Sequence, residues 1–192
     1  KYNIDPDLST FGKALGNGFA ISALAGKREF MELGGLHHKK ERVFLISTTH
    51  GAENHALAAT LATIRYYKEH DVISHLWEQG RKFEEGVMQS VSELKLEGHV
   101  SVIGPHCCSV YTTADQDKKP SQPFRTLFIQ ETMKRGLLMP SSIVSYSHTD
   151  KDIRETIEKI HESLIVYKKA LNEGIEKYLE GKSVQPVFRK FN

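Results

Sequence analysis

The chain has 192 residues, of which 39% are hydrophobic and 26% charged, the balance of an ordinary globular protein. Its net charge of +2 is too small to indicate nucleic-acid binding, and its basic residues are scattered along the chain. No apolar run approaches the roughly 20 residues that a membrane-spanning helix needs. The first five residues contain neither Met nor the start of a signal peptide, so we expect the chain to be part of a longer protein.

The two cysteines, Cys107 and Cys108, are neighbours. Adjacent cysteines rarely pair with each other because of disulfide geometry, and no further cysteine is spaced for a zinc site. We expect both to be buried, reduced side chains in a cytoplasmic protein.

A lysine near the N-terminus stands between a short apolar run and a glycine-rich loop. Residues 8–11 are typical of a buried strand, and Gly12, Lys13, Gly16 and Gly18 follow. Glycine lets such a loop turn with positive φ and lets a ligand approach its backbone. A lysine there can lose its hydration shell, which leaves the amine free to attack a carbonyl carbon and form a Schiff base. The spacing alone also fits an ordinary surface lysine between two elements.

The remaining pattern predicts an α/β protein. Strands are expected at residues 8–11, 21–25, 43–47, 100–103, 109–113 and 137–140, and helices at 27–33, 55–70, 72–94, 124–134 and after a capping box at 149–152. The continuous apolar run at 43–47 favours a strand of a mainly parallel sheet. The apolar register changes at Asp71, so we expect residues 1–70 to end one sheet domain and residues 71–192 to form a small α+β domain.

Two helices carry apolar stripes. Leu57, Leu61 and Ile64 share one face of the helix at 55–70. The last helix has a longer stripe, which we interpret as core packing, made of Ile153, Ile157, Ile160, Leu164, Tyr167 and Leu171.

The lysine segment resembles the class III aminotransferases, and most nearly glutamate-1-semialdehyde aminomutase and its relatives. The resemblance rests on Pro6-Asp7-Leu8-Ser9-Thr10-Phe11-Gly12-Lys13, Gly16-Asn17-Gly18 and Ala25-Gly26-Lys27-Arg28-Glu29-Phe30-Met31. It implies pyridoxal 5'-phosphate as the cofactor, held by Lys13 as an internal aldimine. It also implies that the Lys13 amine, once displaced by substrate, moves a proton between the substrate carbon and the cofactor.

The segment from Ser47 to Asn54 is a candidate anion site, because hydroxyls precede a helix N-terminus there. A plain N-cap by Thr49 or Glu53 is the alternative. The family resemblance implies that Thr49 reaches the cofactor phosphate of a second subunit, and hence a homodimer.

Other polar clusters are weaker candidates for a catalytic or metal site. Ser145 and His148 could make a nucleophile pair, but no G-x-S-x-G elbow surrounds a serine. His37 and His38 are adjacent and diverge, so we expect a solvated loop and no metal site. The tail at 186–192 is expected to dock on its own domain or on a neighbouring subunit.

The resemblance covers only the C-terminal half of the family. The acidic partner of the pyridine nitrogen would lie upstream of Lys13, and Asp5 and Asp7 are too near Lys13 to serve. We expect amino transfer between small molecules, either transamination or an aminomutase reaction, and an isolated chain that is inactive. The alternative is a catalytically incompetent binding or assembly module.

Overall fold

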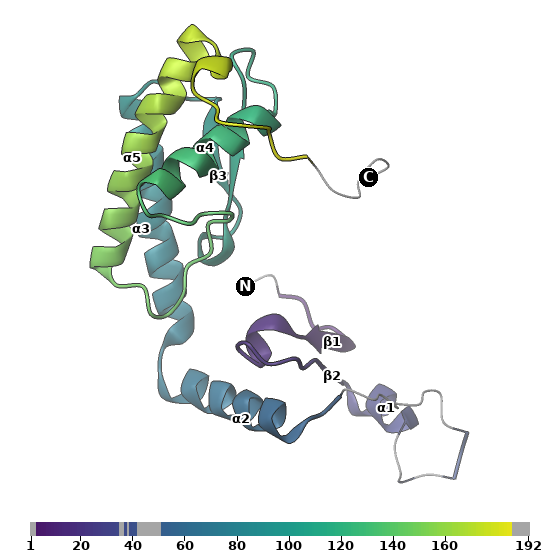
Figure 1. Cartoon of the computed structure of the whole chain (residues 1–192). Helices are drawn as coiled ribbons and strands as arrows, with labels where there is room; N and C mark the ends of the chain where they lie inside the picture. The colour runs from purple at the N-terminus through teal and green to yellow at the C-terminus, as the bar shows by residue number, and fades with distance from the viewer. Residues whose placement is uncertain (1–2, 35–36, 38, 42–50, 186–192) are drawn as a thin grey trace. The chain divides into compact units, whose positions relative to one another are not determined.

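The computed structural model describes residues 3–34, 37, 39–41 and 51–185. It divides into two compact units, Lys1–Asp71 and Val72–Asn192, which we call the N-unit and the C-unit (Figure 1). Within the described ranges, no helix combines the length and the apolar character needed to cross a membrane.

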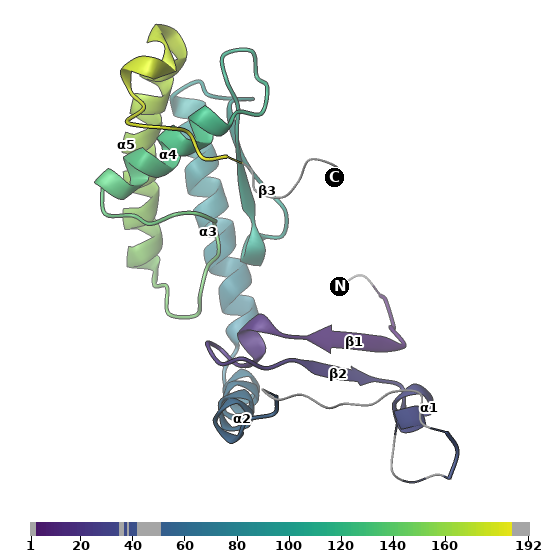
Figure 2. The same cartoon turned by 45° about the vertical axis from the view of Figure 1, so that its right-hand side comes forward.

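The described residues of the N-unit form a hairpin and four helical segments. Strand β1 (Leu8–Phe11) pairs antiparallel with β2 (Ala23–Gly26), so that Leu8 lies opposite Gly26, and a 3-10 helix η1 (Lys13–Leu15) lies between the strands (Figure 2). The other segments are α1 (Arg28–Met31), η2 (Glu32–Gly34) and α2 (Asn54–Glu69).

The N-unit has almost no core of its own. Among its described residues only Gly16 and Ala56 are buried. The apolar stripe of α2 is exposed: Leu57 is 42% exposed, Leu61 55% and Ile64 40%. A two-stranded hairpin is at best marginally stable in water, so this unit needs another surface against which to pack.

The described strands form two antiparallel pairs, one in each unit, and the mainly parallel sheet expected for the domain at residues 1–70 stays a prediction. A parallel pair needs a crossover of a dozen or more residues, usually a helix, and residues 12–22 between β1 and β2 are too few for one. The strand expected at 43–47 lies outside the described residues. The helices expected at 27–33 and 55–70 form as α1 with η2 and as α2, while β2 is displaced two residues toward the C-terminus from the expected start.

The C-unit packs helices on one face of a small sheet. In chain order it has α3 (Val72–Glu93), β3 (Val100–Ile103), η3 (His106–Cys108), β4 (Val110–Thr113), α4 (Gln122–Lys134), α5 (Asp150–Glu173) and η4 (Ile175–Lys177). Strands β3 and β4 are antiparallel, with Val100 opposite Thr113 and Ile103 opposite Val110. Val102 and Tyr111 are buried under the helices, whereas Ile103 and Val110 are exposed, so the other sheet face is open.

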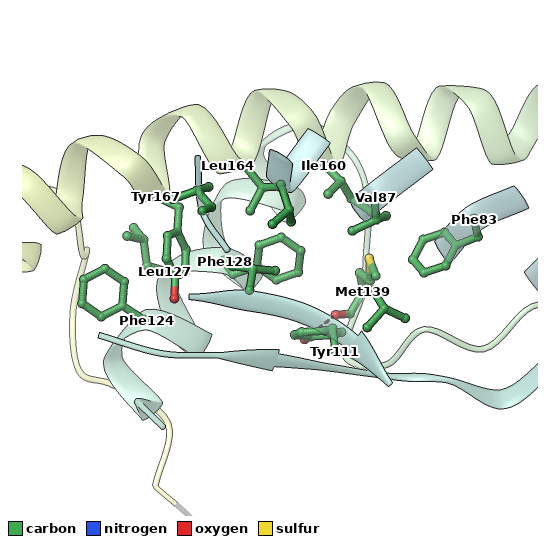
Figure 3. Close-up of a cluster of buried hydrophobic side chains, with 14 of the residues drawn as sticks. Phe83, Val87, Tyr111, Phe124, Leu127, Phe128, Met139, Ile160, Leu164 and Tyr167 are labelled. Carbon is green, nitrogen blue, oxygen red and sulfur yellow. Dashed lines mark hydrogen bonds between the residues drawn. The ribbon is translucent and has the colours of Figure 1, made fainter. Parts of the chain in front are cut away.

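A single hydrophobic core fills the space between these helices and the sheet (Figure 3). The stripe of α5 belongs to it as expected: Ile160, Leu164 and Tyr167 are fully buried, and Ile157 and Leu171 pack at its edge. The helix begins with the expected capping box, in which the Thr149 and Asp152 side chains each bond the other's backbone N–H.

The strand expected at 137–140 does not form. The Tyr111 hydroxyl donates to the Met139 carbonyl at 3.0 Å, and Arg125 Nη2 donates to the Pro140 carbonyl at 3.0 Å. Side chains therefore use carbonyls that a ladder would need, and Pro140 has no N–H to donate. An isolated bridge joins Ser109, just before β4, to Ser142, just after this segment.

The expectation for the cysteines is partly wrong. Both are free thiols, but Cys107 is only half-buried and Cys108 is exposed. They lie in the short η3 turn between β3 and β4, where the chain runs over the surface and leaves the core.

Candidate functional site

Lys13 stands directly after the end of β1 in a left-handed backbone conformation. Gly12 is extended, and Lys13 has a φ of 48°. A non-glycine residue in this region costs about 1–2 kcal/mol. The turn is closed by Leu15, whose N–H donates to the Gly12 carbonyl at 3.1 Å. The Lys13 side chain is exposed, and within the described part of the chain its amine has no hydrogen bond or ion pair.

A second tight turn follows at once. The Phe19 N–H donates to the Gly16 carbonyl at 3.2 Å. A Cβ added at Gly16 would lie 2.5 Å from the Phe19 carbonyl oxygen and 2.7 Å from Ile21 Cγ2, so only glycine fits. Asn17, inside this turn, is also left-handed, with a φ of 45°. The glycine-rich loop is thus a close-packed turn with a defined shape.

The first turn of α2 lies against this loop. Glu53 is the N-cap, and its side chain accepts no hydrogen bond from a backbone N–H of the helix. The Leu57 N–H donates to the Glu53 carbonyl at 2.9 Å, so the N–H groups before it have no partner within the helix. The His55 ring lies 5.5 Å from the Phe19 ring, and its Nε2 lies 2.9 Å from Glu53 Oε2.

These residues fit part of a pyridoxal phosphate site. A lysine amine for the aldehyde and an uncapped helix N-terminus for an anion belong to the same unit. The desolvation of Lys13 expected from the sequence is not supplied by the described residues, because the side chain is exposed. Thr49, the expected phosphate ligand, lies outside the described residues.

The two carboxylates nearest to Lys13 in the sequence, those of Asp5 and Asp7, lie beside Lys27. Asp7 pairs with Lys27 at 2.6 Å, and Asp5 lies 3.9 Å from the same amine. Both carboxylates are more than half exposed. The origin of the acidic partner stays a prediction.

The C-unit residues singled out from the sequence have structural roles. The Ser145 N–H donates to His148 Nδ1 at 3.1 Å, so this nitrogen accepts from the backbone and is not available to a serine hydroxyl. His75 Nε2 contacts the His148 carbonyl at 3.1 Å. Among the side chains that the structure describes, no three metal-binding groups come together.

A hollow on the C-unit does not offer a better site. It has a volume of about 370 Å³ and is lined by Ile73, Ser74, Trp77, Glu78, Arg81 and His106. Its charges are paired with neighbours: Arg81 with Glu78 and Glu85, and His106 Nδ1 with Glu84 at 2.7 Å. The hollow is an open surface depression with no unpaired charge in its lining.

Two residues of the lysine site were not predicted from the sequence, His55 and Phe19. The only signal for them is an aromatic residue after Gly18 and a second ring in the first turn of α2. Their contact spans 36 positions of the chain, and helical or strand periodicity does not report such pairs.

A known protein family and several known proteins are similar to this chain over most of its length. The family described as Aminotransferase class-III matches residues 1–173. The chain is 31% identical to a 3-aminobutyryl-CoA aminotransferase of Cloacimonas acidaminovorans, covering 88% of this chain and 40% of that protein. It is 32% identical to a glutamate-1-semialdehyde 2,1-aminomutase of Sulfurihydrogenibium azorense, covering 84% and 39%.

Solved structures agree in fold. The FumI protein of Sphingopyxis sp. MTA144, in its PLP internal aldimine form, superposes with a TM-score of 0.74 at 23% identity, over 88% of this chain and 39% of that one. A transaminase with PLP bound gives a TM-score of 0.75 at 18% identity, over 90% and 40%. The chain therefore spans about two fifths of the length of the relatives that it matches.

Proposed function

Since this chain belongs to the class III aminotransferases, we propose that it carries the lysine-bearing part of a pyridoxal-phosphate-dependent enzyme that transfers an amino group. The N-unit would be the end of the large cofactor-binding domain, and the C-unit the small C-terminal domain. The reaction is either transamination or an aminomutase reaction, and its substrates are small amino donors and acceptors.

One observation carries the proposal: Lys13 is held in a strained, left-handed turn beside a helix N-terminus whose N-cap residue, Glu53, makes no side-chain bond to a backbone N–H. Strained backbone persists where the surrounding structure fixes it, and it gathers at functional sites. The glycine that follows at position 16 tolerates no side chain, so the shape of the lysine turn is specified by the sequence.

Each residue has a defined task. When bound, pyridoxal phosphate supplies an electron sink for a substrate carbanion. Lys13 would hold the cofactor covalently through its amine, and then, as a free amine, move a proton to and from the substrate carbon. Thr49 and the first N–H groups of α2 would bind a phosphate, in a homodimer the phosphate of the other subunit.

The 192-residue chain alone would be inactive. It spans about two fifths of its relatives, Asp5 and Asp7 lie beside Lys27, and the described residues of the N-unit leave the Lys13 side chain exposed. We propose that the pyridine nitrogen needs a carboxylate from outside this chain and that Lys13 needs further burial. We propose that an upstream polypeptide supplies both, in a cytoplasmic protein.

The test is the absorption spectrum of the complete protein that carries this chain, mixed with pyridoxal phosphate. We expect a band of lysine-bound cofactor that is lost in Lys13→Ala and kept in Lys27→Ala. Lys27 is a suitable control because it lies in the same unit and is paired with Asp7. Absence of the band from the unchanged protein would contradict the proposal.

A second candidate function is an assembly or binding module without catalysis. The exposed stripe of Leu57, Leu61 and Ile64 favours it, because such a face needs a partner whether or not chemistry follows. The state of Lys13 distinguishes the two functions. A binding module would bind its partner through α2 while Lys13 carries no cofactor.

A further inference from the structure

We infer that His55 is a positioning residue for Lys13: its ring holds Phe19, and Phe19 holds the turn that sets the lysine backbone. The inference rests on the proposed function, since it assigns a residue to the same site. It also adds to that function, because the His55 side chain has no proposed contact with cofactor or substrate.

The ring of His55 is held from two sides. Its Nε2 lies 2.9 Å from a carboxylate oxygen of Glu53, two residues earlier. Its ring centroid lies 5.5 Å from that of Phe19, with the planes inclined by 58°. This is within the spacing and the tilted arrangement that aromatic pairs prefer. A histidine can make both contacts at once, whereas phenylalanine keeps only the ring contact and alanine keeps neither.

Phe19 is linked to Lys13 through two consecutive backbone turns. Phe19 N–H bonds the Gly16 carbonyl, and Leu15 N–H bonds the Gly12 carbonyl. Gly16 lies between these two turns and packs closely against the Phe19 carbonyl and Ile21. A shift of the Phe19 backbone must therefore move Gly16, and through it the short helix that Lys13 begins.

The backbone on both sides of this contact is strained. Of six non-glycine residues with positive φ in the described part of the chain, three lie in the two segments that meet here: Lys13, Asn17 and Ala52, with φ of 48°, 45° and 52°. Such conformations relax unless neighbouring contacts fix them. The His55–Phe19 contact joins the two strained segments.

The experiment compares three variants of the complete protein: His55→Ala, His55→Phe and the control His70→Ala. His70 is a matched control because it is also on α2 in a ring contact, stacked 4.0 Å from Tyr66, but at the other end of the helix. Two quantities are measured: hydrogen exchange of the amides of residues 15–19, and the rate at which added pyridoxal phosphate becomes lysine-bound, followed by absorbance.

We expect His55→Ala to speed amide exchange in the turn about two- to tenfold, the factor for losing one aromatic pair. It should also slow covalent attachment of pyridoxal phosphate. His55→Phe should restore both quantities, and His70→Ala should change neither.

Two results would overturn the inference: unchanged amide exchange in His55→Ala, or faster exchange with an unchanged attachment rate. Failure of the proposed function is distinguishable, because then the unchanged protein itself would bind no pyridoxal phosphate. The exchange measurement would still report whether His55 holds the turn.

Discussion

The Tyr167 hydroxyl donates a hydrogen bond to the Ala114 carbonyl at 2.6 Å and accepts one from the Ala114 N–H at 3.1 Å. This pair joins α5 to the residue that follows β4, inside the C-unit core. Phe124 of α4 packs on the same ring, with centroids 4.9 Å apart. One buried phenol thus joins three elements.

We predict that Tyr167→Phe lowers the free energy of unfolding of the C-unit by about 1–3 kcal/mol, because it removes the hydroxyl that donates to the buried Ala114 carbonyl. The Ala114 N–H keeps its hydrogen bond to the His99 carbonyl at 2.7 Å. Urea unfolding followed by the fluorescence of Trp77, the one tryptophan of the chain, measures this. Tyr178→Phe is the control, since that half-buried hydroxyl bonds an accessible carboxylate, Glu173. Equal stability of the two variants would contradict the assignment.

Alkaline pH should lower the stability of the C-unit through the Tyr167 hydroxyl. Burial raises the pKa of the Tyr167 phenol above its usual value. The folded C-unit therefore keeps this proton when the unfolded chain has begun to lose it. Its stability should be constant below about pH 10 and fall as the pH rises further, and Tyr167→Phe should flatten that fall. Urea midpoints between pH 8 and 11 test this.

Acid stability should depend on Glu131, which is buried in α4. Burial raises the pKa of Glu131, but hydrogen bonds from Gln130, Arg135 and Lys134 outweigh it and hold the pKa below its usual value. Such a group stabilises the fold above the pKa of an unfolded glutamate, near pH 4, and that contribution disappears as the pH falls through the folded pKa.

Accordingly, Glu131→Gln should cost about 1–3 kcal/mol of unfolding free energy at neutral pH and less at pH 3. Glu155→Gln on α5, which changes an exposed glutamate 3.6 Å from Lys151, should leave the acid profile unchanged. A Glu131→Gln profile parallel to that of the unchanged chain would contradict this role.

The apolar face of α2 should be needed for assembly and not for the C-unit. Leu61→Asp should change the unfolding free energy of the C-unit by less than about 0.5 kcal/mol, since Leu61 belongs to the N-unit and is exposed. It should abolish copurification of this chain with a co-expressed upstream segment of the protein. Ala62→Asp, one position along the same helix but off the stripe, should preserve copurification. Retained binding in Leu61→Asp would show that α2 is not the docking face.

The sequence predicts the long helices well and the pairing of strands poorly. Helix α3 starts at the expected residue and ends one residue early, and α5 begins at its capping box, because stripes and caps are local signals. A short apolar run predicts a strand but does not indicate which other strand it pairs with. The run at 8–11 pairs antiparallel with β2, and the segment at 137–140 gives carbonyls to Tyr111 and Arg125 instead of joining a sheet.

The sequence likewise predicts part of the candidate site and misses the rest. A motif singles out Lys13, and the glycine at 16 is required by the space around it. The left-handed backbone of Lys13 and the ring contact of His55 with Phe19 depend on chain segments that meet only in three dimensions. No periodicity or spacing within one segment encodes them.

The most direct measurement is the position of the covalent link. The complete protein would be saturated with pyridoxal phosphate, reduced with borohydride and digested, and its modified peptides identified by mass spectrometry. The account predicts one reduced pyridoxal phosphate adduct, on the peptide that contains Lys13. An adduct on another lysine such as Lys27, or no adduct on any peptide, would contradict it.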